Sequence, residues 1–246
     1  MQKQSLAVTV ALLVLLSVTA MAATGQYDQQ IQQAVSQKIH DKKDLEGVNS
    51  SVEDGIVTLT GTVNLYQDKL NASKQIKKVA DVSGVRNEIV VAGKTVPDAQ
   101  LETKLAKQLA YDRVGYYDNT FNYLALEVKD GVVTVRGDTM WDPPKDSALA
   151  IVAHTPGVKD VVDDVTVLPD SLFDNSLRAS TARAIYGDSM LGKYASDPVH
   201  PIRIVVDNGH VTLYGKVESK MDKTIAGVRA SSVPGAFSVD NKLVVD

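Results

Sequence analysis

Four histidines are the side chains of this sequence best suited to metal binding or acid–base chemistry. They are His40, His154, His200 and His210, and no carboxylate or cysteine partner recurs beside them. Metal sites need ligands at short and regular spacings, and a catalytic base needs a partner that tunes it. We therefore interpret all four histidines as structural or solvated. The sequence predicts no catalytic residue, no metal and no cofactor.

The acidic pair Asp163-Asp164 invites a calcium-site hypothesis. Calcium requires several oxygen ligands from a shaped loop, and no such spacing surrounds this pair. The sequence also lacks cysteine, a phosphate-binding glycine loop and the nucleophile elbow of hydrolases. We interpret the pair as a solvated strand edge and expect the protein not to be an enzyme.

Aromatic side chains offer a different chemistry, which is contact with lipid. Tyr116, Tyr117 and Phe121 lie in a long segment before the second of three hairpin patterns, and Trp141 follows that hairpin. Tyr and Trp favour membrane interfaces because they join an apolar body to a polar tip. These four residues are our candidate lipid contacts. The alternative is that they cap small cores or join one module to the next, the commoner role of buried aromatics.

The charge of the chain limits its partners. There are 26 Lys and Arg against 30 Asp and Glu, for a formal net charge of −4. Nucleic-acid binding needs a basic surface, and charge-driven attachment to anionic lipid needs a polybasic cluster. The candidate basic side of one predicted helix is formed by Lys69, Lys74, Lys77 and Lys78. Because such a run is more often a solvated face, we expect no nucleic-acid partner and lipid contact mainly through apolar groups.

The N-terminus resembles an export signal. Lys3 is followed by an uncharged run from Leu6 to Ala20, and Ala20-Met21-Ala22 places small residues where a signal peptidase cleaves. We expect residues 1–22 to be a cleaved signal peptide and the mature protein to be periplasmic. The alternative is an uncleaved anchor, because the uncharged stretch from Ser5 to Tyr27 is just long enough to span a bilayer.

Internal repetition is the strongest signal in the chain. Asp54-Gly55, Asp130-Gly131 and Asn208-Gly209 each precede an alternating apolar strand. Asp-Gly and Asn-Gly favour a two-residue hairpin turn, in which both residues need positive φ. A second glycine follows each turn at constant spacing and suggests a bulge or a close backbone approach. These glycines are Gly61, Gly137 and Gly215.

Each hairpin is followed by a predicted helix and a last strand. The helices are expected at Gln67–Ala80, Lys145–His154 and Lys220–Ser231. Gly157 and Gly235 suit the left-handed conformation that closes a helix, and Asp81 replaces glycine in the first copy. Asn87 and Asn241 begin the final strand segment, where the second copy has Asp163.

An amphipathic helix opens each repeat. Asp28, Asp98 and Asp174 precede apolar residues at helical spacing, and we interpret them as helix N-caps. Each repeat is therefore helix, strand, strand, helix, strand. The predicted fold class is α+β, with three tandem αββαβ modules, each a three-stranded mixed sheet with two helices on one face. We place module one at 23–93, module two at 94–169 and module three at 170–246, and we expect the modules to support one another by docking.

The hairpin, helix and closing strand resemble the BON domain over about residues 28–92, 98–168 and 174–245. The resemblance implies an envelope location, association with phospholipid membranes and protection during osmotic stress, without catalysis. It leaves two function classes open. One is a phospholipid-binding envelope protein, and the other is a protein-interaction or chaperone-like scaffold with envelope proteins as partners.

Overall fold

The structure is a computed structural model, and it describes residues 26–112, 119–197 and 200–246. The chain divides into two compact units, residues 1–94 and 95–246. The first unit holds module one, and the second holds modules two and three. The predicted signal peptide, residues 1–22, lies outside the described residues.

Module one has the predicted order of elements. After a helix whose described residues are 26–40, it contains the following: η1 (Lys43–Leu45), β1 (Val48–Glu53), β2 (Ile56–Val63), α2 (Tyr66–Ile76), β3 (Gly84–Asn87) and β4 (Val90–Val91). β2 is the central strand, antiparallel to β1 and parallel to β3 and β4. One hairpin and one helical crossover therefore build a mixed sheet.

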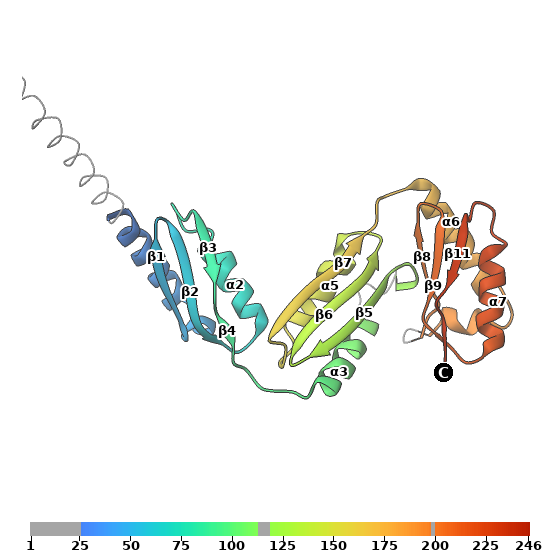
Figure 1. The fold of residues 1–246 in the computed structure, drawn as a ribbon, viewed down its shortest axis with the longest axis horizontal. Helices are drawn as coiled ribbons and strands as arrows, with labels where there is room; N and C mark the ends of the chain where they lie inside the picture. The colour runs from blue at the N-terminus through green and yellow to red at the C-terminus, as the bar shows by residue number, and fades with distance from the viewer. Residues whose placement is uncertain (1–25, 113–118, 198–199) are drawn as a thin grey trace, which may run out of the picture. The chain divides into compact units, whose positions relative to one another are not determined.

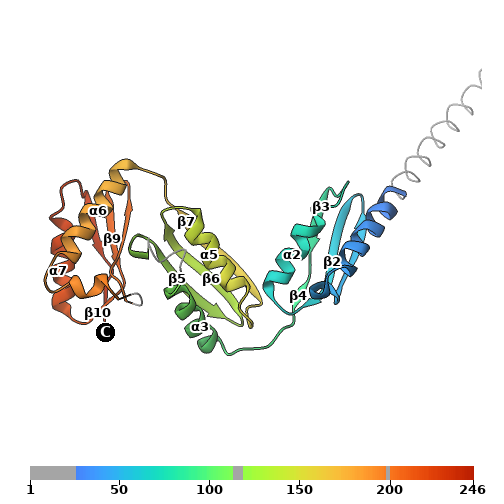
Figure 2. The same cartoon turned by 180° about the vertical axis from the view of Figure 1, so that it is seen from behind.

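Module two repeats this order with longer strands. Its elements are α3 (Asp98–Ala110), η2 (Asn119–Phe121), β5 (Tyr123–Lys129), β6 (Val132–Thr139), α5 (Asp142–Ala153) and β7 (Asp160–Val167). β6 pairs antiparallel with β5 and parallel with β7. Figure 1 looks onto the strands of modules one and two, and Figure 2 shows the helices on the opposite face.

Module three has the same topology with an inserted turn. Its elements are α6 (Leu172–Tyr186), η3 (Gly192–Ala195), β8 (Arg203–Asp207), β9 (His210–Tyr214), β10 (Lys216–Val217), α7 (Lys220–Ser231), β11 (Ser238–Asn241) and β12 (Val244–Val245). β9 lies between β8 and β11, and β10 continues the parallel pairing with β12. The predicted fold of three αββαβ modules is confirmed.

The helix periodicity correctly locates the cores. Val35 of module one and Leu105 of module two are fully buried, and so is Thr181 at the equivalent place in module three. Modules one and three each have a large cluster of buried apolar residues between helices and sheet. The stability of a module of this size depends on burying the apolar face of each helix against the sheet.

The N-cap interpretation of the three aspartates is wrong. Asp98 is the first residue of α3 and provides no cap, while α6 is capped by Ser171, whose Oγ accepts a hydrogen bond from the Asp174 amide at 3.2 Å. The aspartates bind the hairpin turn instead. The Asp28 carboxylate accepts the amides of Asp54 and Gly55 at 3.0 and 2.9 Å.

The same contact recurs in the other modules. Asp98 accepts the amides of Asp130 and Gly131 at 2.7 and 3.0 Å. Asp174 accepts those of Asn208 and Gly209 at 3.0 and 2.8 Å. Both residues of each turn have positive φ, and successive amides in such a turn form an anion-binding concavity. Each first helix is thereby fastened to the hairpin by its own aspartate.

The glycines occupy positions that other residues would strain. Gly55, Gly131 and Gly209 have φ between 75° and 81°. Gly61 and Gly137 have φ of 105° and 130°, and a Cβ there would lie 2.1 Å from the Gly47 oxygen and 2.0 Å from the Tyr123 oxygen. Gly215 is similar, with a Cβ position 2.5 Å from the Pro201 oxygen. Gly157 and Gly235 also have positive φ, but they lie in the turn that follows the helix and not directly at its end.

Candidate functional site

The structure describes two of the four predicted lipid contacts, Phe121 and Trp141. Tyr116 and Tyr117 lie outside the described residues. Phe121 is partly buried and packs against the core of module three, whereas the Trp141 side chain is 44% exposed. Phe121 and Trp141 lie at the same end of the β5–β6 hairpin, because the neighbouring Asn122 accepts the Met140 amide through Oδ1 at 2.9 Å.

Phe121 belongs to a contact between modules two and three. Tyr123 stacks on Tyr214 with ring centroids 3.7 Å apart and an interplanar angle of 4°. Arg203 donates through Nη1 to the Asn122 carbonyl oxygen at 3.2 Å. Phe121 and Tyr123 therefore contact module three, and for Phe121 this is the role that we gave as the alternative to lipid contact.

A cavity of about 780 Å³ lies beside α3. Its walls are largely apolar and include Leu124 and Leu126, while Arg203 and Lys216 of module three contribute positive charge. Asn122 also lines it, and the buried Nδ2 atom of this residue has no hydrogen-bond partner among the residues that the structure describes.

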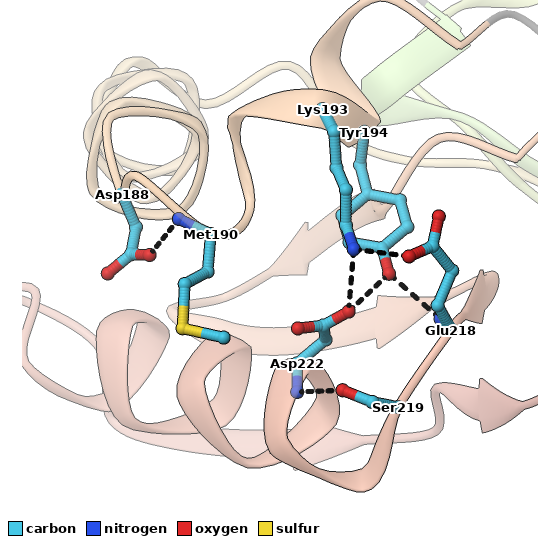
Figure 3. Close-up of polar contacts among 7 residues, drawn as sticks. All are labelled: Asp188, Met190, Lys193, Tyr194, Glu218, Ser219 and Asp222. Carbon is cyan, nitrogen blue, oxygen red and sulfur yellow. Dashed lines mark hydrogen bonds and ion pairs between the residues drawn. The ribbon is translucent and has the colours of Figure 1, made fainter.

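The inserted turn of module three carries a polar cluster, which Figure 3 shows. Lys193 of η3 forms ion pairs with Glu218 at 2.5 Å and with Asp222 at 3.1 Å. The Tyr194 hydroxyl donates to Asp222 Oδ2 at 2.6 Å and accepts the Glu218 amide at 2.8 Å. Ser219 caps α7 by accepting the Asp222 amide through Oγ at 3.0 Å.

Electrostatics in this cluster favour the ionised pair. The hydrogen bond from Tyr194, together with Lys193, lowers the pKa of the nearly inaccessible Asp222 carboxyl, and hydrogen bonds to Glu218 and Asp222 raise the pKa of Lys193. Burial and the bond to Asp222 raise the pKa of the Tyr194 hydroxyl, so it stays protonated and donates. Every one of these groups is engaged within the fold. The cluster therefore fastens η3 to the start of α7, and it offers no free acid, base or nucleophile.

The same insertion has a second anchor. Asp188 pairs with Arg229 of α7 at 2.8 Å and accepts the Met190 amide at 2.9 Å. The backbone bond from Met190, followed by the bond from Arg229, lowers the pKa of Asp188. Two ion-paired anchors, at Asp188 and Lys193, thus hold the start of this insertion against α7 and the residues just before it.

Three of the four histidines and Asp163 of the acidic pair make local contacts. His154 contacts the Ala150 carbonyl oxygen at 2.7 Å, His200 contacts Asp197 at 3.1 Å and His210 contacts the Ser238 hydroxyl at 2.7 Å. Asp163 pairs with Lys145 at 2.8 Å. Within the described part of the chain, no group of three or more His, Cys, Asp or Glu side chains is placed to hold a metal ion.

The sequence did not predict an exposed aromatic pair that lies in the described part of module three. Phe173 and Phe237 of module three are 49% and 71% exposed, and their ring centroids are 5.8 Å apart. Leu172 beside them is 87% exposed. Leu172 and Phe173, the first two apolar residues of α6, do not belong to the buried apolar stripe that begins at Leu177. Their position outside the stripe is the feature of the sequence that could have indicated an exposed apolar site.

Comparison with known proteins identifies one family. The model of the BON domain matches residues 27–93, 97–169 and 188–246. The third match begins after α6, although α6 packs on β8 and α7 as the first helix of module three. No match was found among the curated proteins.

Solved structures give only remote likeness. One is CdsD, a structural protein of the type III secretion system of Chlamydia trachomatis, at 12% identity and a TM-score of 0.26, covering 87% of this chain and 91% of that one. Another is the periplasmic domain of the inner-membrane protein PrgH from S. typhimurium, at 10% identity and a TM-score of 0.21, covering 86% and 100%. Among the described residues, no helix is long and apolar enough to cross a membrane.

Proposed function

The chain belongs to the BON domain family, and from this premise we propose that it is a non-catalytic periplasmic protein that binds phospholipid membranes and supports the envelope under osmotic or related stress. Export would use residues 1–22 as a cleaved signal peptide. The three modules then make up the mature protein on the periplasmic side of a membrane.

One observation carries the proposal: ordered modules hold large aromatic side chains at their surface. Trp141, Phe173 and Phe237 are between 44% and 71% exposed. The ion-paired polar clusters of the described residues, by contrast, have partners within the fold. Exposed aromatic groups on a rigid support favour shallow contact with a lipid interface.

A second candidate function, a protein-binding scaffold, is favoured by the edge strand β7. This strand is eight residues long and pairs with β6 alone among the described strands. An open edge of this length can accept an extended peptide by β-augmentation. Asp160, Asp163 and Asp164 on the strand would favour a basic peptide.

Co-sedimentation with liposomes tests the proposed function. The sample is residues 23–246, because the apolar run at Leu6–Ala20 would itself bind lipid. We expect saturable pelleting with phospholipid vesicles. Failure to pellet with any composition, together with suppression of client-protein aggregation, would replace lipid binding by the scaffold function.

A further inference from the structure

Module three carries a small exposed apolar patch, which we call the aromatic tip and define as Leu172, Phe173 and Phe237. The three side chains are 87%, 49% and 71% exposed, and the two phenyl rings stack at 5.8 Å. His210 lies edge-on to Phe237 with ring centroids 6.2 Å apart. Such exposure of adjacent large apolar groups is unusual for a surface with no binding role.

The fold holds the tip rigidly. Ser171 caps α6, so Leu172 and Phe173 lie in the first turn of that helix. The Phe237 amide donates to the Gly209 carbonyl oxygen at 2.9 Å, which fixes Phe237 at the hairpin turn. A Cβ at Gly235 would lie 3.4 Å from the Phe173 ring. Three separate elements therefore converge on the two rings.

Phenylalanine at position 237 is not needed for folding of a module. The residue there covers the glycine of the hairpin turn, and Ser83 and Lys159 cover Gly55 and Gly131 in the same way in modules one and two. Likewise Val96 approaches Gly157 where Phe173 approaches Gly235. The stacked pair of phenylalanines is thus specific to module three, and it leaves apolar surface exposed to solvent.

Carboxylates flank the tip. Asp170 and Asp207 are exposed; the first lies three residues before Phe173, and the second two residues before Gly209, which Phe237 covers. Arg178 is buried and interacts electrostatically with both carboxylates. Its guanidinium group donates to the Val206 carbonyl oxygen at 2.5 Å. The outer surface at this point therefore combines negative charge with aromatic faces.

We propose that the aromatic tip inserts into the interface of zwitterionic phospholipid, with the ammonium groups of ethanolamine or choline head groups held by the phenyl faces and by Asp170 and Asp207. Ammonium groups bind aromatic faces by cation–π attraction, and carboxylates add charge complementarity. The side chains of the tip are exposed at the surface, which suits insertion into a bilayer. This inference rests on the proposed membrane function and assigns the contact to module three, away from the residues predicted from sequence.

Vesicle binding of two matched variants tests the assignment. In Phe173→Val/Phe237→Ser, each phenylalanine is replaced by the residue type that approaches the corresponding glycine in another module. These residues are Val96, which approaches Gly157, and Ser83, which approaches Gly55. The control, Val228→Ser, removes an apolar side chain of α7 whose exposure of 61% lies between those of Phe173 and Phe237. With residues 23–246 and vesicles of phosphatidylethanolamine and phosphatidylcholine, we expect the double variant to bind about tenfold more weakly or worse. The control should bind as the unchanged protein does.

A fluorescence measurement reports insertion directly. Trp141 is the only tryptophan, so Trp141→Phe/Phe237→Trp places a single probe at the tip. Its emission should shift to the blue on adding the same vesicles, and lipids brominated near the head group should quench it.

Each other outcome is decisive. If the unchanged protein binds and the tip variant binds equally well, the tip assignment fails while the proposed function stands. Binding to phosphatidylglycerol vesicles alone, lost at high salt, would also overturn the assignment. If the unchanged protein binds no vesicle, the proposed function fails and takes this inference with it.

Discussion

At the residue scale, one aspartate in each module holds the first helix to the hairpin turn. Asp28, Asp98 and Asp174 bind both amides of a turn that lies 26 to 35 residues further along the chain. Charge-assisted bonds of this kind are about twice as strong as neutral ones. An aspartate at a helix start is also the usual N-cap, so sequence could not separate the two roles; the choice depends on where the hairpin packs.

Removing the Asp28 carboxylate should loosen the first hairpin. We expect Asp28→Ala to destabilise the turn by about 1–3 kcal/mol, because two turn amides lose their acceptor. Asp28→Asn keeps one acceptor oxygen and should lose less. Hydrogen exchange at the Gly55 amide measures the change. Asp41→Ala is the control, and unchanged Gly55 protection in Asp28→Ala would show that the carboxylate is dispensable.

At the element scale, one contact docks the last strand onto the second helix. The Asn87 amide donates to the Lys69 carbonyl oxygen, and Asn241 donates to that of Lys223, both at 2.7 Å. Module two has Asp163, which has no amide to donate. Lys145, at the position of Lys69 and Lys223, pairs with Asp163 and donates to the Val165 carbonyl oxygen at 2.9 Å. The side chain of the helix residue thus takes over the role of the missing amide.

A pair of variants tests this exchange. Lys145→Ala should lower the stability of module two by about 1–2 kcal/mol, because Asp163 loses its partner. Adding Asp163→Asn supplies an amide that can donate to the carbonyl oxygen of residue 145, and it should restore at least half of the loss. Urea unfolding followed by Trp141 fluorescence reports on module two. Additive effects of the two substitutions would contradict the exchange.

Sequence periodicity predicts the modules well and the exposed site poorly. Local signals define the hairpins, because Asp-Gly and Asn-Gly require the positive φ that the turns adopt. Helix ends were less well located: α2 ends at Ile76, four residues before the expected Ala80, and α5 begins at Asp142, before Pro143-Pro144. The pairing of Phe173 with Phe237 joins residues far apart in sequence, so no local pattern reveals it.

At the scale of the whole molecule, the two compact units divide the chain unevenly. Modules two and three share one unit and meet through the Tyr123–Tyr214 stack and the bond from Arg203 to Asn122. Of the residues predicted to contact lipid, Phe121 packs against the core of module three at this contact. The exposed aromatic surface of that unit then includes Trp141 and the tip of module three, on a chain with more acidic than basic residues.

The salt dependence of vesicle binding tests the central claim most directly, because apolar insertion and charge attraction respond differently to ionic strength. The measurement is the affinity of residues 23–246 for phosphatidylethanolamine–phosphatidylcholine vesicles at low and at high salt. We predict saturable binding whose affinity changes less than about twofold, since an acidic chain that inserts aromatic groups does not depend on attraction to lipid phosphate. Absence of binding, or binding that salt abolishes, would contradict the account.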